Sequence, residues 1–233
     1  MSRAKAWVSW SSGKDSAWAL HEVRRRSELD VTALLTTVNA THSRVAMHAV
    51  RESVLEAQAV AAGLPLVKVP IPSPCPNEVY EAAMREAMAR AHAEGVTHIV
   101  FGDLFLEDVR RYREEKLDGT GIAPVFPLWG RDTAELAREM IAAGVQAVLT
   151  CVDPKKLPRA FAGRWFDSAL LAHLPAGVDR CGENGEFHTC VVAGPMFAAE
   201  LGVTVGETVE RDGFVFSDVL LRDKALRATA RSD

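Results

Sequence analysis

A short polar segment near the start of the chain places a glycine, a lysine and an aspartate between an apolar run and a helix-forming stretch. Its residues are Ser11, Ser12, Gly13, Lys14, Asp15 and Ser16. The unpaired amides and the positive dipole end of a helix start favour an anion, glycine allows close backbone approach, and lysine adds a full positive charge. The segment therefore predicts a phosphate-binding loop with Lys14 as its charged group.

This loop is not a Walker A motif, which needs a glycine five positions before the Gly-Lys pair and a serine or threonine after it. Val8 and Asp15 occupy these places. A carboxylate beside a phosphate makes sense mainly if it caps helix amides or holds magnesium, so Asp15 is a candidate Mg²⁺ ligand. The alternative is that Ser11, Ser12 and Asp15 only cap the helix while Lys14 is solvated.

Charged residues also follow a later apolar run. Gly102 and Asp103 end that run beside the expected mouth of the site, which places Asp103 to meet magnesium or substrate. Alternating charges then continue over residues 107–115. Acidic and basic residues four apart would form ordinary surface pairs on a helix, so a solvated face is one interpretation of this run. We assign Arg113 to that surface.

A third polar segment covers residues 182–189. Its Asn-Gly step is a strong hairpin signal, so a plain turn is one interpretation. Two carboxylates and an imidazole, those of Glu183, Glu186 and His188, also lie within six residues. They offer what amide formation requires, namely a group that takes a proton from an incoming amine and groups that hold a cation or ammonium. Both interpretations stay open on the residues alone.

The elements that must position these residues alternate along the first two thirds of the chain. Apolar, β-branched runs predict buried strands, which are Ala6–Trp10, Val31–Val38, Leu66–Ile71, His98–Phe101 and Ala147–Val152. Amphipathic stretches between them predict helices, one with an apolar stripe from Met47 to Ala61, and Gly63, Gly95 and Gly144 follow three of these helices as stop signals. The alternation predicts a doubly wound α/β fold with a mainly parallel sheet, whose ligands bind beyond the carboxyl ends of the strands.

This rhythm changes after Asp153. Prolines punctuate a short helical stretch, a glycine-rich loop follows, and residues 204–221 predict short strands with a turn at Asp212-Gly213. The prediction is a nucleotide-binding α/β domain over residues 1–153. A smaller carboxyl-terminal region over residues 154–233 is expected to complete the substrate site.

Composition narrows the classes of function. A net charge of -4 disfavours long nucleic acid as a partner. No apolar stretch reaches the roughly 20 residues of a membrane helix and the first residues lack a signal-peptide pattern, so a cytoplasmic protein without a membrane partner is expected. The four cysteines lack metal or redox spacing, and only Cys181, which adjoins the third polar segment, is kept as more than a passive thiol. A homodimer stays open.

The residues of the first loop closely resemble the SGGKDS motif of the PP-loop ATP pyrophosphatases, with Ser12 in place of a glycine. That departure matters if the position needs a positive φ, which serine adopts at some cost. RVAMHAVRE at residues 44–52, FGDLFLEDVRRYRE at residues 101–114 and GENGEFHT at residues 182–189 resemble the ATP-binding family of the diphthine-ammonia ligases. Together these motifs span most of the chain.

The resemblance implies an adenine nucleotide α-hydrolase type of fold and ATP as cofactor, with its pyrophosphate end on the first loop. Besides that loop, the residues implied at the nucleotide are Thr37, His48 and Gly102. The residues implied at the acceptor are Asp103, Glu107, Asp108, Arg111 and Glu183. Lys14, Glu186 and His188 are the implied catalytic residues, and Asp15 and Asp103 the implied Mg²⁺ ligands. A lone histidine such as His48 is otherwise more often a packed or capping residue.

These observations lead to the hypothesis of an ATP-dependent, AMP-forming ligase. It would adenylylate the carboxylate of a small molecule or a protein for amide formation with ammonia or an amine. Two alternatives stay open: a tRNA-modifying adenylylase, which predicts paired cysteines and a basic surface, and a regulator that binds ATP without turning it over. The charged segment at residues 182–189 argues against the regulator, and nothing in the sequence identifies the acceptor.

Overall fold

The computed structural model describes residues 3–39, 44–45 and 50–222, and these residues form two sheets. Five strands of the first sheet run parallel in the spatial order β4–β2–β1–β5–β6. They are β1 (Ala4–Ser9), β2 (Leu29–Asn39), β4 (Leu66–Ile71), β5 (Val96–Val100) and β6 (Ala123–Val125). The short β3 (Arg44–Val45) pairs antiparallel with the end of β2. The strand order reverses between β1 and β5, so a ligand crevice is expected at their carboxyl ends.

Helices cover both faces of this sheet, as the doubly wound prediction requires. On one face lie α1 (Lys14–Arg26) and α2 (Glu52–Ala62), and on the other α3 (Asn77–Ala93) and α4 (Glu107–Leu117). Side chains of β1 alternate between the two cores, because Val8 packs with α1 and α2 whereas Trp7 packs with α3. The fold class is therefore confirmed.

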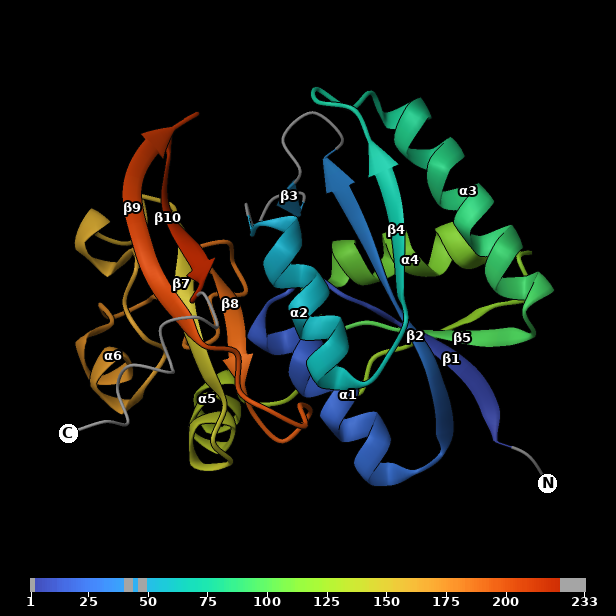
Figure 1. Ribbon diagram of the computed structural model, residues 1–233, viewed down its shortest axis with the longest axis horizontal. Coiled ribbons are helices and arrows are strands. Elements are labelled where there is room, and N and C mark those ends of the chain that lie inside the picture. The colour runs from blue at the N-terminus through green and yellow to red at the C-terminus, as the bar shows by residue number, and fades with distance from the viewer. Residues whose placement is uncertain (1–2, 40–43, 46–49, 223–233) are drawn as a thin grey trace, which may run out of the picture.

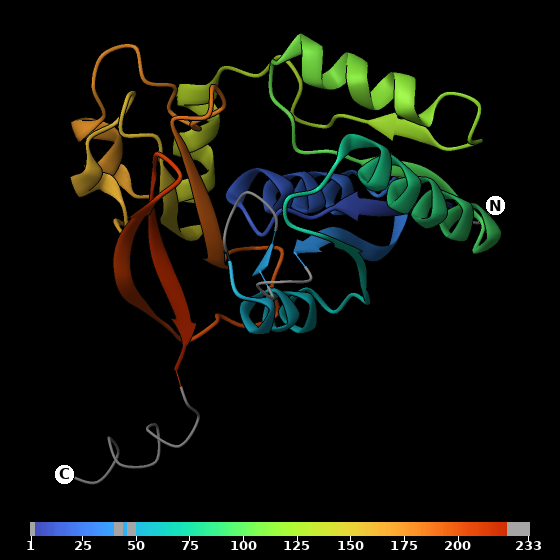
Figure 2. The same ribbon diagram turned by 90° about the horizontal axis from the view of Figure 1, so that it is seen from above.

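A second, antiparallel sheet has the order β8–β7–β10–β9. Its strands are β7 (Gln146–Val152), β8 (Phe187–Ala193), β9 (Val203–Arg211) and β10 (Phe214–Leu221). Around it lie α5 (Thr133–Ala142), the 3-10 turn η1 (Arg159–Phe161) and α6 (Ser168–His173). The first-sheet helices α1 and α2 lie between the two sheets (Figure 1). Seen from above, the sheets occupy opposite ends of the long axis (Figure 2).

The expected place of β7 in the parallel sheet is wrong, because β7 pairs antiparallel with β8 and β10. A strand buried on both faces is a continuous apolar run in either kind of sheet, so its sequence could not reveal its partners. The fifth parallel strand is instead β6, a three-residue edge strand that contains Pro124. The sheet changes between β6 and β7, while the division of the chain at residue 153 stays a prediction.

Local stop and turn signals correspond to the observed backbone. Gly63 caps the end of α2 with φ of 65°, as expected for a glycine beyond a helix. Strands β9 and β10 are joined at Asp212 and Gly213, both of which have positive φ. The stripe expected from Met47 onward begins outside the described residues, which also exclude His48.

Gln58 of α2 joins the two sheets through side-chain hydrogen bonds inside the core. Its Nε2 donates to the carbonyl of Ser12 at 3.1 Å and to that of Val191 at 2.7 Å. Its Oε1 accepts from Trp10 Nε1 at 3.0 Å. The side chain is fully buried, so no water can replace these partners without a rearrangement.

The described helices include none with the length and apolar character needed to cross a membrane.

We expect Gln58→Met to lower the free energy of unfolding by roughly 1–3 kcal/mol, because the buried partners of Gln58 lose their hydrogen bonds. Gln146→Met is the matched control, since Gln146 is exposed and should change stability by no more than about 0.5 kcal/mol. Urea denaturation of both variants measures the difference. Equal stability of the two variants would contradict the structural role of Gln58.

Candidate active site

The predicted phosphate loop connects the end of β1 to the start of α1, with a backbone that serine rarely adopts. Ser12 has φ of 69°, so this position does need the positive φ that a glycine provides at no cost. Gly13 occupies the N-cap position and has no side chain to cap the helix. Ser11 Oγ accepts from the Gly13 amide at 3.3 Å, and the Lys14 amide donates to Thr189 Oγ1 of β8 at 3.1 Å. The simple capping alternative therefore does not describe this loop.

Lys14 is buried rather than solvated, with only 1% of its side chain exposed. Its Nζ donates to both carboxylate oxygens of Asp15 at 2.9 and 2.8 Å and to the carbonyl of Cys181. The rings of Phe166 and Phe187 lie 5.3 and 5.6 Å from Nζ. Burial alone would lower the pKa of Lys14, but Asp15 and the surrounding acidic groups raise it above its ordinary value, so the side chain stays a cation.

The third polar segment forms a tight turn before β8, organised by the carboxylate of Asp179. Its Oδ1 accepts from the amides of Cys181 and Glu183, both at 3.0 Å, and its Oδ2 accepts from Thr133 Oγ1. Glu186 Oε1 accepts from the Asp179 amide at 3.0 Å. Glu186 Oε2 is buried and has no hydrogen-bond partner among the described residues. The segment thus forms the turn that its Asn-Gly step predicts. Its hydrogen bonds with Asp179 also fix the position of Glu186.

Two titratable groups near Lys14 are shifted in opposite directions. Burial raises the pKa of Glu183 to about 7, and repulsion from Asp15 and Asp103 adds to this although the Leu104 amide, 2.8 Å from Glu183 Oε1, opposes it. Burial lowers the pKa of His188 to about 4, helped by the charge of Lys14. His188 is therefore a neutral imidazole at neutral pH.

Gly102 and Asp103 lie against the first loop at the strand-order reversal. A Cβ at Gly102 would come within 2.7 Å of the backbone of Asp15 and Ser16, so glycine is needed for this close packing. Asp103 pairs with Arg113, whose Nε and Nη2 lie 2.6 and 3.0 Å from its oxygens. The assignment of Arg113 to the solvated surface is wrong, because 28% of its side chain is exposed and its guanidinium also covers the Phe101 ring.

The two expected Mg²⁺ ligands, Asp15 and Asp103, each already pair with a cation of the chain. Among the described residues no group of three or more histidine, cysteine or acidic side chains is placed to hold a metal. Mg²⁺ needs no such group, since proteins bind it through one or two carboxylates plus substrate phosphates and waters. Burial raises the pKa of Asp15, with Asp179 contributing although Lys14 opposes it. Because the carboxylates of Asp15 and Asp179 repel one another, a cation bound beside Asp15 would be favoured.

Three residues that the sequence associates with the acceptor lie on exposed turns at the start of α4. They are Glu107, Asp108 and Arg111, of which the last two form a loose pair at 3.7 Å. Arg110 and Glu114, which are four residues apart on the same helix, form a surface pair of the expected kind at 2.7 Å. The structure therefore places this part of the charged run on the solvated face.

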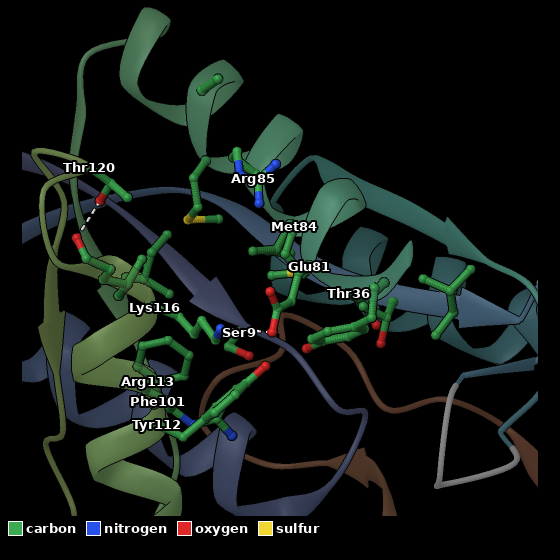
Figure 3. Close-up of a pocket in the computed structure, with 18 of the residues that line it drawn as sticks. Ser9, Thr36, Glu81, Met84, Arg85, Phe101, Tyr112, Arg113, Lys116 and Thr120 are labelled. Carbon is green, nitrogen blue, oxygen red and sulfur yellow. Dashed lines mark hydrogen bonds and ion pairs between the residues drawn. The ribbon is translucent and has the colours of Figure 1, made fainter. Parts of the chain in front are cut away.

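A pocket of about 1010 Å³ opens beside the first loop, over the carboxyl ends of the parallel strands and between α3 and α4 (Figure 3). Ser11 reaches it from the loop and Thr37 from the end of β2. Thr36 lines it too, and its Oγ1 is buried without a partner among the described residues. Lys14 does not line this pocket. The sequence indicated the strand ends but gave no sign that α3 and α4 form the outer walls.

Several residues that build the site were not predicted from the sequence. Thr189 is the last residue of the motif at residues 182–189. Its membership of that motif was the one sequence signal that could have predicted its contact with the first loop. Asp179 and Gln58 carried no local signal, because their partners lie far along the chain or depend on the turn geometry. The thiol of Cys181 is buried and donates to the Thr133 carbonyl, and burial raises its pKa. Its carbonyl, not its sulfur, contacts Lys14.

Comparison with known proteins gives consistent matches over most of the chain. A family model described as the diphthamide synthase N-terminal domain matches residues 4–122, and one described as the diphthamide synthase C-terminal domain matches residues 132–220. The chain is 31% identical over 120 residues to a diphthine–ammonia ligase of Rattus norvegicus, covering 49% of this chain and 45% of the relative. It is 30% identical over 142 residues to that of Danio rerio, covering 58% and 54%. The chain thus spans about half the length of these curated relatives.

We expect Ser12→Gly to be about 1 kcal/mol more stable than Ser12→Ala in thermal or urea denaturation. Both variants remove a buried hydroxyl that has no partner among the described residues, but only glycine relieves the positive φ. The alanine variant is thus the control for loss of the hydroxyl. Indistinguishable stabilities would mean that the loop backbone is not strained at this position.

The opposed shifts of Glu183 and His188 predict opposite effects of pH. The folded state binds the Glu183 proton more tightly than the unfolded state between pH 4.5 and about 7, so this group lowers stability as pH rises through that window. His188 binds its proton less tightly when folded, so it raises stability as pH rises from about 4 to 6.5.

Relative to the unchanged protein, the free energy of unfolding of Glu183→Gln should therefore rise with pH over this range, and that of His188→Asn should fall. Each slope is at most about 1.4 kcal/mol per pH unit. Urea denaturation at half-unit pH steps measures both curves. Two curves parallel to that of the unchanged protein would show that neither group has a shifted pKa.

Proposed function

Because the chain belongs to the diphthamide synthase family, we propose that it is a cytoplasmic, ATP-dependent, AMP-forming amide ligase. A substrate carboxylate attacks the α-phosphorus of ATP and displaces pyrophosphate, and ammonia or an amine then attacks the acyl carbon and displaces AMP. The observation that carries the proposal is the position of the first loop: its Ser11 lines a large pocket, and its Lys14 amide is bonded to Thr189 on the strand that bears His188.

In this proposal the first loop holds the pyrophosphate portion of ATP. The start of α1 supplies amides and a positive dipole end, and Ser11 faces the pocket. The ammonium of Lys14 contributes a fixed positive charge beside the loop while it stays bonded to Asp15 and Cys181. Such a preorganised charge stabilises an anion without reorganisation of the site.

The nucleoside portion occupies the part of the pocket nearest β1 and β2. Thr36 Oγ1 is buried without a partner among the described residues, and a ligand hydroxyl or base nitrogen would satisfy it. Thr37 lines the same part of the pocket. Asp15, with Asp103 behind it, would hold Mg²⁺ together with phosphate oxygens, and this ion would neutralise charge on the phosphates.

Amide formation releases a proton from the incoming amine, and the chain has two acceptors close to the first loop. His188 is neutral at neutral pH and would receive that proton only transiently, because its lowered pKa makes the imidazole a weak base. Glu186 offers the buried Oε2, which has no donor among the described residues. Holding the activated carboxyl and the amine in one site supplies a further rate advantage through orientation.

The direct test is product analysis with ATP, ammonium and a library of carboxylic acids. We expect AMP and pyrophosphate in equal amounts, with pyrophosphate exchange into ATP dependent on the acid. Release of ADP would contradict the adenylylation mechanism.

Glu186→Gln serves as the internal variant, because the amide keeps an acceptor for the Asp179 amide but loses the negative charge. Its kcat should fall by about 10²-fold while ATP affinity is retained. Unchanged kcat in Glu186→Gln would remove this residue from the chemistry without affecting the product test.

A further inference from the structure

The pocket is large for a single small-molecule site. Sites for a single drug-sized ligand usually enclose roughly 300–1,000 Å³. At about 1010 Å³ this pocket lies at the upper end of that range. The nucleoside of the proposed reaction uses the part beside Ser11 and Thr36, so a second compartment remains between α3 and α4. We define this α3–α4 compartment by the side chains of Tyr80, Glu81, Met84, Arg85, Tyr112 and Lys116.

Apolar and aromatic groups form the body of the α3–α4 compartment. Tyr80 comes from α3. Met84 also comes from α3 and Tyr112 from α4, while Phe101 lies at the sheet end (Figure 3). Thioether and ring surfaces of this kind suit the hydrocarbon or ring portion of a small molecule. The compartment is continuous with the part beside Ser11, so a ligand here can extend toward the first loop.

Some charged side chains of the compartment form ion pairs with one another, and others do not. Lys116 of α4 donates to Glu81 of α3 at 2.7 Å, and the two side chains point toward one another across the space between the helices (Figure 3). Arg113 is paired with Asp103. Arg85 is an exposed residue that lines the pocket, and it has no hydrogen bond or ion pair within the described residues, although its charge acts on the nearby Glu81. Asp118, the other lining acid, lies on the opposite wall just past the end of α4.

We infer that the α3–α4 compartment is the acceptor subsite, and that the acceptor is a free small organic acid that carries a second anionic group. This inference rests on the proposed function. The carboxylate to be activated must lie at the α-phosphorus beside the first loop, so the apolar body of the acceptor extends outward between α3 and α4. Its far end then meets Arg85, whose planar guanidinium binds carboxylate or phosphate groups in two-point contacts.

The test uses the complete chain in acid-dependent exchange of labelled pyrophosphate into ATP. Pairs of acids with the same apolar body are compared, one member bearing a terminal methyl group and the other a terminal carboxylate. We expect the diacid to have a KM at least about 10-fold lower, the difference that one charge-assisted hydrogen bond provides. Arg85→Gln should abolish this advantage while leaving the KM for ATP and the KM for the monoacid unchanged.

Arg90→Gln is the matched control, because Arg90 lies on the same helix, is exposed and pairs with Glu94 outside the pocket. It should behave as the unchanged protein. Equal KM values for diacid and monoacid, or an unchanged preference in Arg85→Gln, would overturn the inference. If AMP forms only with a protein-borne carboxylate, the inference fails and the proposed ligase stands. If no acid yields AMP or exchange, the proposed function fails and the inference fails with it.

Discussion

The site depends on one buried positive charge, the ammonium of Lys14. An isolated charge of this kind would cost several kcal/mol to bury, so the chain surrounds it with the Asp15 carboxylate, the Cys181 carbonyl and two aromatic rings. The amide of the same residue donates to Thr189 on the second sheet. Lys14 therefore fixes the first loop against the strand that carries the proposed proton acceptor, at both its backbone and its side chain.

Burial at the same place shifts the pKa values of two neighbours of Lys14. Burial keeps His188 neutral, and Lys14 adds to this effect because protonation would place a second cation near it. Glu183 is crowded by Asp15 and Asp103, and its bond from the Leu104 amide only partly offsets this. The two sheets thus meet at a place where an acid retains its proton and a base lacks one at about neutral pH. Such pairs of oppositely shifted groups are typical of sites that move protons.

The sequence predicted those features that depend on near neighbours. Alternating strand and helix patterns gave the doubly wound class, and a glycine past a helix gave the end of α2 at Gly63. The polar hexad gave the position of the loop, and the resemblance to an ATP-binding motif identified Ser12 as a position where φ could be positive. In each case the physical cause lies within a few residues of the signal.

The features that sequence reasoning missed depend on contacts between distant segments. The apolar run of β7 fits either kind of sheet, and β6 is too short for a periodic pattern. Arg113 looks like one charge among many on a helix, yet Asp103 and the Phe101 ring hold it inward. Conversely, Glu107 belongs to a motif that suggested a role at the acceptor, yet it is exposed to solvent in the first turn of α4.

The proline in β6 has a consequence for how this molecule meets its own copies. Pro124 sits on the outermost parallel strand and has no amide hydrogen, so the row of donors along that border is interrupted. A border of this kind is a poor template for an incoming strand from another chain. The first sheet therefore ends at β6, and Pro124 disfavours the addition of a strand from a second copy at this border.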